Sequence, residues 1–404
     1  MTMTSCFRTN EPSSVFFRPA MLALAPEAIM AHPLKYVWQL SVWPELFWLS
    51  DSLLAALSQA RLAQGKLLTK VTSLGFDHSL EAHFDILTEE VIKTSAIEGV
   101  KLDLESVRSS VARRLGLPVA GLPPIDRAVD GLVEVLLEAT RQYDKPLTAT
   151  RLKRWQAGLF PTGWSGISKI HVGKWRPAEM PMRVVSGTQG REKIHYEAPP
   201  GDKVEEEIRQ FLGWWTSSLG QVDGLLRSGL AHFYFVTIHP FEDGNGRLAR
   251  ALTDMALAQD EKLSTRYYSL SSQIMEERKD YYDVLEACQK GSGDVTSWLK
   301  WYLECYTRAI ERAEKLIGNV LSKARFWQNH SHVGMNERQR KVVNRLLDAG
   351  REGFQGGLTT RKYVSMAKVS RATAFREISE LLEKGILIQN PARGRSVSYN
   401  LRWS

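Results

Sequence analysis

Apolar residues recur at the spacing of an α-helix along most of this chain. From Leu34 to about Leu117 an aromatic cluster leads into helical spacing, and the pattern resumes near Lys203 and continues to about Ala324. Gly99 follows one periodic stretch as a C-cap, because glycine adopts the left-handed backbone of a helix end without strain. We expect helices over residues 80–98, 104–115, 126–142 and 148–159.

Two stretches interrupt this pattern. Residues 163–201 are rich in glycine, proline and β-formers such as Val184 and Val185, which predicts a β-hairpin. Residues 325–334 are polar and are interpreted as a linker. A compact unit follows, with helices expected over residues 337–349, 360–367 and 371–384, Ser370 as the N-cap of the third, and a hairpin pairing 386–388 with 397–399.

Charge is distributed unevenly along the chain. The 404 residues include 53 Lys and Arg and 45 Asp and Glu, a net charge of +8. Residues 335–404 hold 14 basic and 6 acidic residues, so this segment carries the whole excess. A basic terminal unit favours an anionic partner, most often nucleic acid, although a solvated basic face fits the charge equally well.

Composition excludes several classes of protein. Hydrophobic residues make up 43% and charged residues 24%, which is typical of a globular protein and not of a disordered chain. No apolar run reaches the roughly 18 residues of a membrane-spanning helix. Cys6, Cys288 and Cys305 lack metal-site spacing, which argues against zinc or a disulfide framework and fits a reducing cytoplasm. Residues 1–33 are interpreted as a flexible extension, with Met30 as an alternative start.

The densest chemistry lies in the segment His239-Pro-Phe-Glu-Asp-Gly-Asn-Gly-Arg-Leu-Ala-Arg250. Pro240 disfavours helical geometry at His239, so the chain should leave a helix there and expose an imidazole that can take a proton. Gly244 and Gly246 allow a tight loop at the start of the next helix, an arrangement that attracts phosphate.

Charged groups complete this segment. Arg247 and Arg250 lie three residues apart and share one helix face, which suits a polyphosphate. Asp243 offers the carboxylate with which Mg²⁺ is commonly held beside a nucleotide. For a lone histidine, a buried side chain followed by a surface glycine turn would be the simpler interpretation, but the combination of residues here favours a nucleotide site.

These residues resemble the signature of the Fic family, HxFx(D/E)GNGRxxR, at every defined position. Members of that family mostly transfer AMP from ATP to a hydroxyl side chain of a target protein. The resemblance implies that His239 is the base for the target hydroxyl and that Asp243 binds Mg²⁺. It also implies ATP contacts from Gly244, Asn245 and Gly246 to the α-phosphate region, and from Arg247 and Arg250 to the β- and γ-phosphates.

A second segment, Thr94-Ser-Ala-Ile-Glu-Gly99, resembles the inhibitory motif (S/T)xxxE(G/N) of some Fic proteins. Glu98 stands at the C-terminal end of its expected helix, where the helix dipole disfavours an anion. The resemblance implies that Glu98 pairs with Arg250 and blocks the γ-phosphate site. A solvated surface glutamate is the alternative, and whether Glu98 supports removal of AMP stays open.

Two further segments resemble Fic elements. Gly173-Lys-Trp-Arg176 precedes a hairpin that resembles the flap, which registers a target segment by strand-like pairing. The expected docking residues of the flap are Met182, Arg183, Val184, Val185, Ser186 and Gly187. The positions that resemble the adenine pocket are Tyr281, Tyr282 and Gln289, with core packing as the alternative.

The basic C-terminal segment resembles a winged helix-turn-helix unit. Its third helix would enter a major groove, and its wing would lie near phosphates. The candidates for DNA contact are Arg371, Thr373 and Arg376 on the helix and Arg393 and Arg395 on the wing. Glu377, Glu380 and Glu383 are expected to make the later face of the helix acidic, so protein docking or dimerisation is the alternative.

The sequence therefore predicts a mainly α-helical, cytoplasmic protein adenylyltransferase that uses ATP and Mg²⁺ and is autoinhibited by Glu98. We expect an extension over residues 1–33, a helical N-terminal domain with the inhibitory helix over 34–117, a Fic core with its flap over 118–324 and a winged helix over 335–404. A DNA-binding regulator with a nucleotide-sensing core, or a transferase for another donor, are the alternatives. No membrane partner is expected, and the target protein and a homodimer stay open.

Overall fold

The computed structural model describes residues 36–72, 76–117, 124, 126–179, 181–186, 193–350, 354–391 and 397–403, without the side chains of residues 76–78, 186 and 193. The extension expected over residues 1–33 lies outside the described residues. None of the helices in the described ranges combines the length and the apolar character needed to cross a bilayer.

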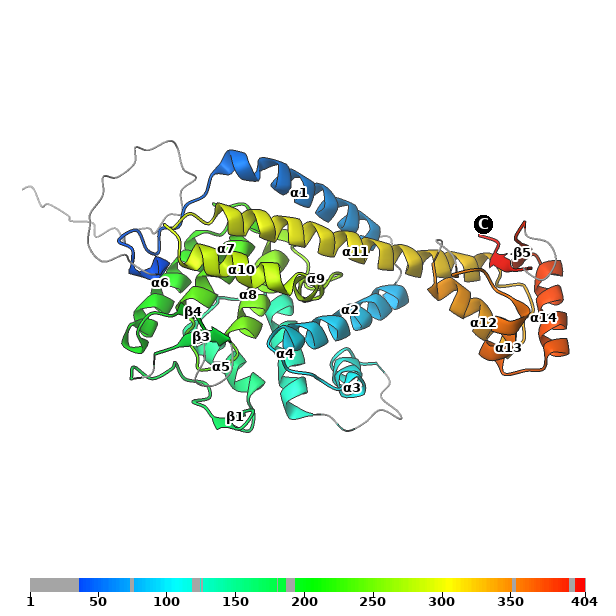
Figure 1. The fold of residues 1–404 in the computed structure, drawn as a ribbon, viewed down its shortest axis with the longest axis horizontal. Helices are drawn as coiled ribbons and strands as arrows, with labels where there is room; N and C mark the ends of the chain where they lie inside the picture. Colours follow the sequence, from blue (N-terminus) through cyan, green and yellow to red (C-terminus); the bar gives the residue numbers. More distant parts are fainter. Residues whose placement is uncertain are drawn as a thin grey trace, which may run out of the picture. The chain divides into compact units, whose positions relative to one another are not determined.

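Helices dominate the described part of the chain, as expected (Figure 1). The α-helices are α1 (Ser50–Thr72), α2 (Phe76–Ile97), α3 (Leu104–Arg114), α4 (Arg127–Arg141), α5 (Ala149–Leu159), α6 (Val204–Ser217), α7 (Gly224–Ile238), α8 (Asn245–Glu261), α9 (Leu270–Glu276), α10 (Arg278–Gln289), α11 (Thr296–Asn329), α12 (Glu337–Asp348), α13 (Thr360–Ala367) and α14 (Arg371–Glu383). Three antiparallel hairpins pair β1 (Trp164–Ser165) with β2 (Ser168–Lys169), β3 (Arg183–Ser186) with β4 (Lys193–Glu197), and β5 (Leu387–Gln389) with β6 (Tyr399–Leu401).

The chain divides into two compact units. The first holds the residues up to Gly65 together with His83–Ile310, and the second holds Lys66–Ala82 together with Glu311–Ser404. The division falls inside α1, α2 and α11, so three helices contribute residues to both units.

One sequence expectation about this region is wrong. Residues 325–334 were expected to form a linker, but α11 continues through its first half to Asn329. Phe326 is buried in the core of the second unit, and Trp327 packs against the same core. These two apolar rings stabilise the last turns of the helix, because they bury surface that a solvated linker would leave in water.

Helix α7 lies at the centre of the first unit. Each of its residues from Leu225 to Ile238 is buried, and α8 is buried without a break from Leu248 to Ala258. A helix that is buried on all sides must be enclosed by other elements rather than face solvent on one side. The loop that joins α7 to α8 therefore connects two helices that are packed on all sides.

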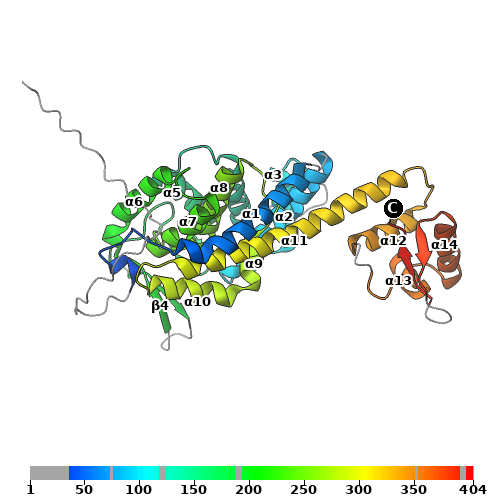
Figure 2. The same ribbon diagram turned by 90° about the horizontal axis from the view of Figure 1, so that it is seen from above.

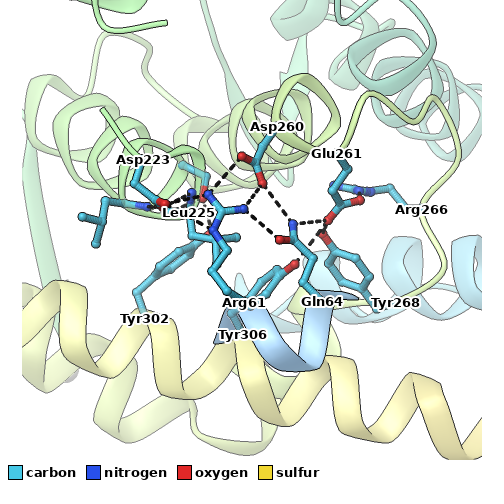
Figure 3. A network of polar contacts seen from close by, with 12 residues as sticks. Arg61, Gln64, Asp223, Leu225, Asp260, Glu261, Arg266, Tyr268, Tyr302 and Tyr306 are labelled. Atoms are coloured by element: carbon cyan, nitrogen blue, oxygen red, sulfur yellow. Dashed lines mark hydrogen bonds and ion pairs between the residues drawn. The ribbon is translucent and has the colours of Figure 1, made fainter. Parts of the chain in front are cut away.

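A polar network fixes the other ends of α7 and α8 (Figure 3). The guanidinium of Arg61 in α1 donates to Asp223 at 2.7 Å and to Asp260 at 2.5 Å. Asp223 is the N-cap of α7 and also accepts from the Leu225 backbone N–H at 2.9 Å, while Asp260 lies in the last turn of α8. Gln64 joins the network by donating to Asp260 at 3.0 Å. One arginine thus ties the start of α7 to the end of α8.

The second unit contains a helix-turn-helix followed by a hairpin (Figure 2). Three residues separate α13 from α14, and Lys368 among them has left-handed backbone, with φ at 51°. Ser370 caps α14, as expected, by accepting from the Thr373 N–H at 3.1 Å. The hairpin β5–β6 follows α14, in the position of a wing.

The acidic face expected on α14 is wrong in one respect. Glu377 does not face solvent, because its carboxylate is 1% exposed and accepts from Arg338 at 2.5 Å and from the Tyr363 hydroxyl at 2.7 Å. Glu380 accepts from Gln339 at 2.8 Å, while Glu383 is exposed. Two of the three carboxylates therefore take part in contacts between helices of the unit.

Candidate functional site

The loop between α7 and α8 begins at a sharp change of direction. His239 has left-handed backbone, with φ at 51°, and its N–H still donates to the Phe235 carbonyl of α7 at 3.0 Å. Pro240 cannot continue the helix, so the chain turns away there as expected from the sequence. The turn leaves the imidazole half-buried on the wall of a cavity.

The hydrogen bond of the His239 ring determines which nitrogen is free. Nδ1 lies 3.2 Å from the Val236 carbonyl oxygen, which can only accept, so Nδ1 carries the hydrogen and donates. Nε2 then keeps its lone pair. Burial lowers the pKa of His239 and Arg176 acts in the same direction, while the bond to the Val236 carbonyl and the charges of Glu98 and Asp243 oppose this. The ring is therefore neutral at neutral pH and can accept a proton.

Arg176 fixes the turn that carries His239. Its Nε donates to the His239 carbonyl at 2.8 Å, and its backbone N–H donates to the Pro240 carbonyl at 2.9 Å. The side chain is 3% exposed, so these bonds form away from water, where they are stronger. Sequence reasoning placed Arg176 only near the flap, because 63 residues separate it from His239 and no local signal joins them.

The middle of the loop is held by its own residues. Phe241 is fully buried, and Asn245 accepts from the Phe241 N–H at 3.0 Å while it donates to the Phe241 carbonyl at 2.8 Å. Both polar atoms of the Asn245 amide are therefore hydrogen-bonded within the loop. Gly244 has left-handed backbone, with φ at 89°, which glycine adopts without a steric cost.

Asp243 lies half-exposed at the tip of this loop. Its carboxylate accepts from the Ser165 hydroxyl and from the Gly244 N–H, and it lies 3.6 Å from Arg247. The neighbouring Glu242 accepts from His171. Two side chains of the β1–β2 region thus contact the loop, and sequence reasoning missed both because they lie more than 70 residues upstream.

Arg247, which is partly buried, and Arg250, which is buried, lie on α8 directly after the loop. Arg247 is stacked 4.9 Å from the Phe160 ring centroid, and its Nε has no hydrogen-bond partner among the described residues. Arg250 is 2% exposed, and its Nη1 likewise lacks a partner in the described part of the chain. Buried donors without a partner are costly, so both groups favour an additional acceptor such as a phosphate oxygen.

Glu98, the residue that follows α2, is an acceptor for another nitrogen of the Arg250 guanidinium. Its Oε1 accepts from Arg250 Nη2 at 2.6 Å, so the expected pair is present. Thr94 adds two bonds to the same guanidinium, through its hydroxyl at 2.6 Å and its carbonyl at 2.9 Å. A Cβ atom on Gly246 would lie only 2.1 Å from Glu98 Oε1, so the carboxylate packs directly against that glycine. Glu98 thus places a negative charge at the start of α8, where the sequence predicts phosphate binding.

A cavity of about 770 Å³ opens beside this pair. Its lining residues are Glu98, Val184, Val185, His195, Tyr196, Val236, His239, Gly246, Arg278, Lys279, Tyr281, Tyr282, Asp283, Leu285, Glu286 and Gln289. The three positions that resemble the adenine pocket are therefore on its wall. Tyr281 also meets the buried His232 Nε2 at 2.9 Å, and Gln289 donates to the Thr237 hydroxyl at 3.3 Å, so both pack into the core as well.

The hairpin β3–β4 also lines the cavity. Val184 and Val185 line it, and the pairing with β4 shifts between these two residues. His195 of β4 bonds to Glu286 of α10 at 2.5 Å, which joins the hairpin to the helix beside it (Figure 2). Of the other expected flap residues, Arg183 bonds to Glu197 and Met182 packs near Tyr196, while Gly187 lies outside the described residues.

The described residues include the helix candidates for DNA contact but not the wing candidates. Arg371 and Arg376 are exposed on α14, and Arg376 lies 3.8 Å from Glu380. Thr373 is partly buried, and its hydroxyl bonds to Ser370 at 2.9 Å. Arg393 and Arg395 lie outside the described residues.

No group of three or more His, Cys, Asp or Glu side chains that could hold a metal ion occurs within the described ranges. Asp243, at which the sequence predicts Mg²⁺, has a half-exposed carboxylate.

Two parts of the chain match known families. Residues 36–117 match a domain of unknown function, DUF4172, and residues 146–257 match the Fic/DOC family. A relative from Nematostella vectensis, "Protein adenylyltransferase Fic", is 26% identical over 237 residues, which cover 57% of this chain and 48% of that protein. The "Probable protein adenylyltransferase aq_aa38" of Aquifex aeolicus is 24% identical over 61% of this chain and 69% of its own.

Solved structures resemble the chain at lower identity. A Fic family protein from Desulfovibrio desulfuricans G20 has a TM-score of 0.49 at 18% identity, covering 87% of this chain and 96% of its own. Fic-1 from C. elegans has a TM-score of 0.46 at 18% identity, covering 67% of this chain and 74% of its own. The matched part spans about half of the Nematostella relative. The chain carries a domain of the Fic/DOC family and is a distant relative of proteins named protein adenylyltransferase.

Proposed function

We propose that this chain is a protein adenylyltransferase that transfers AMP from ATP to a Ser, Thr or Tyr hydroxyl of a target protein. The observation that supports this most directly is the juxtaposition at one cavity. A neutral His239 with a free Nε2 lies on its wall, and Glu98, the partner of Arg250, closes the end beside α8. A base on the wall of a nucleotide-sized cavity, with the cations of α8 next to the Glu98 and Gly246 that line it, is what phosphoryl transfer requires.

The reaction follows from these groups. The hydroxyl oxygen of the target attacks the α-phosphorus of ATP, His239 Nε2 takes the hydroxyl proton, and the bond from the α-phosphorus to the bridging oxygen breaks to release pyrophosphate. The guanidiniums of Arg247 and Arg250 stabilise the negative charge on the departing phosphates. The N–H group of Gly246, in the first turn of α8, suits the α-phosphate region.

Asp243 fits a magnesium ion because its carboxylate is half-exposed beside the loop. Mg²⁺, when bound, neutralises phosphate charge during the transfer. The Ser165 hydroxyl and the Gly244 N–H orient the Asp243 carboxylate. The exposed Val185 and its neighbours on β3 would pair with an extended target segment and bring its hydroxyl toward His239.

The same geometry supports inhibition by Glu98. Its carboxylate already pairs with Arg250 and packs against Gly246, so the terminal phosphate of ATP would meet a like charge there. ATP could then bind only in a shifted position, with its α-phosphorus out of line with the hydroxyl. Removing the carboxylate leaves Arg250 free to bind phosphate.

We predict that Glu98→Gly raises the rate of AMP transfer by roughly tenfold or more, since one hydrogen bond to a charged group contributes about 1.5–3 kcal/mol. Transfer is measured as the mass gain of one AMP on proteins of a lysate supplied with ATP and Mg²⁺. Glu105→Gly is the matched control, because Glu105 is an exposed glutamate in the first turn of α3. Equal rates for Glu98→Gly and wild type would contradict the inhibitory role.

A second prediction concerns pH. Because burial lowers the pKa of His239, its basic form persists to lower pH than in an ordinary histidine. Transfer by Glu98→Gly should therefore stay near its maximum at neutral pH and fall only below the usual histidine value of about 6.5. His239→Ala in the same background should remove transfer at every pH and leave ATP affinity unchanged. If the transfer rate instead falls on acidification with a midpoint above the ordinary histidine pKa of about 6.5, His239 is not the base.

A specific observation also favours duplex DNA as a partner of the second unit. Glu377, which would have repelled phosphates, is buried against Arg338, whereas Arg371 and Arg376 are exposed on α14. Phe375, on the same helix, is 62% exposed, and an apolar ring at that position can contact a thymine methyl group in a major groove.

The alternatives to a protein adenylyltransferase are a transferase that uses a donor other than ATP and a regulator whose core only senses nucleotide.

Duplex DNA should bind the full chain with an affinity that falls steeply as salt rises. We expect Arg371→Ala to weaken binding and to lower the salt slope by about one, the contribution of one phosphate contact. Fluorescence anisotropy with a labelled duplex measures both quantities. Arg154→Ala removes an equal charge from the first unit and should change neither, while absence of binding at low salt would exclude DNA as the partner.

A further inference from the structure

The C-terminal end of α2 positions Glu98. The last carbonyls of a helix lack partners inside the helix and need donors from elsewhere. Gly99, with φ at 80°, allows its own N–H to donate to the Ala96 carbonyl at 3.0 Å, and the Val100 N–H donates to the Ser95 carbonyl at 3.0 Å. The carbonyl of Ile97, which shares a peptide bond with Glu98, receives its donor from a different helix.

That donor is Arg278, the first residue of α10. Its Nε donates to the Ile97 carbonyl at 2.8 Å, although 181 residues separate the two in sequence. The Tyr282 hydroxyl lies 3.4 Å from the same oxygen, and the Arg278 guanidinium lies 5.1 Å from the centroid of the Tyr282 ring. A cation at a helix C-terminus is also favoured by the helix dipole.

This bond acts on Glu98 through a rigid group. The Ile97 carbonyl and the Glu98 nitrogen belong to one planar peptide unit, so a bond to the oxygen restrains the position of the Glu98 Cα atom. The carboxylate of Glu98 is held separately, by Arg250 of α8. Two arginines thus hold Glu98: Arg250 binds its carboxylate, and Arg278 binds the carbonyl that precedes it.

We propose that Arg278 is a positioning residue for inhibition by Glu98, and that the Glu98 carboxylate stays in the phosphate site only while Arg278 holds the Ile97 carbonyl. Arg278 and Tyr282 also line the cavity, so the groups that hold the end of α2 are in contact with the space proposed for the nucleotide. This inference rests on the proposed function, and it adds a second contact to the inhibitory pair.

The test compares initial rates of AMP transfer in two backgrounds. In an otherwise wild-type chain, Arg278→Ala should raise the rate by about fivefold, the factor expected for the loss of one ordinary hydrogen bond, because Arg278 is exposed and water competes for its donor. In the Glu98→Gly background the same substitution should produce no further increase. Arg209→Ala is the matched control, because Arg209 is an exposed arginine of α6 that pairs with Glu206, and it should change neither rate.

Two rate patterns would overturn the proposal. An equal decrease in both backgrounds would make Arg278 a nucleotide contact only, and an unchanged rate in the wild-type background would mean that Glu98 does not depend on it.

Amide hydrogen exchange without nucleotide separates this inference from the proposed function. Arg278→Ala should speed exchange of the amides from Glu98 to Val100, and Arg209→Ala should not. If Glu98→Gly transfers no AMP, the proposed function fails. The amide exchange rates in Arg278→Ala then show by themselves whether Arg278 positions Glu98. Unchanged exchange in Arg278→Ala would contradict the positioning role whatever the activity.

Discussion

The buried guanidinium of Arg250 constrains the whole site. At 2% exposure it requires an anion, because an isolated charge in a protein interior is strongly destabilising. In this structure the anion is Glu98, brought from 152 residues upstream. In the proposed reaction the anion is a phosphate of ATP. Inhibition and substrate binding are then two ways of satisfying the same charge, and the position of α2 decides between them.

The elements around this charge keep the reacting groups in place. Arg61 ties the far ends of α7 and α8 together, and Arg176 holds the loop at the other end through the backbone of His239. Asn245 closes the loop on itself. Since transfer depends on alignment within fractions of an ångström, these supports matter as much as the residues that would touch ATP. In the proposal, the contacts at the end of α2 determine whether Glu98 occupies the phosphate site.

Sequence reasoning succeeded where the cause is local. The turn at His239 follows from Pro240, and the start of α14 follows from Ser370, because each effect acts within a few residues. It failed where hydrogen-bond partners lie far apart in the sequence. No feature of the sequence around Arg278 predicts its bond to the Ile97 carbonyl, 181 residues away. The linker expected over 325–334 was wrong because its polar residues outweighed Phe326 and Trp327 in the pattern, although both rings pack into a core. Likewise Glu377 looks solvated in sequence, and only the packing of α12 against α14 reveals its contact with Arg338.

The most direct test of the central claim measures the affinities for ATP and for AMP by calorimetry, in wild type and in Glu98→Gly. AMP lacks the phosphates that would meet Glu98 and Arg250. If the two anions compete for one site, Glu98→Gly binds ATP more tightly than wild type does, while the affinity for AMP changes little. Equal gains for ATP and AMP, or no gain for ATP, would contradict the claim that Glu98 occupies the phosphate site.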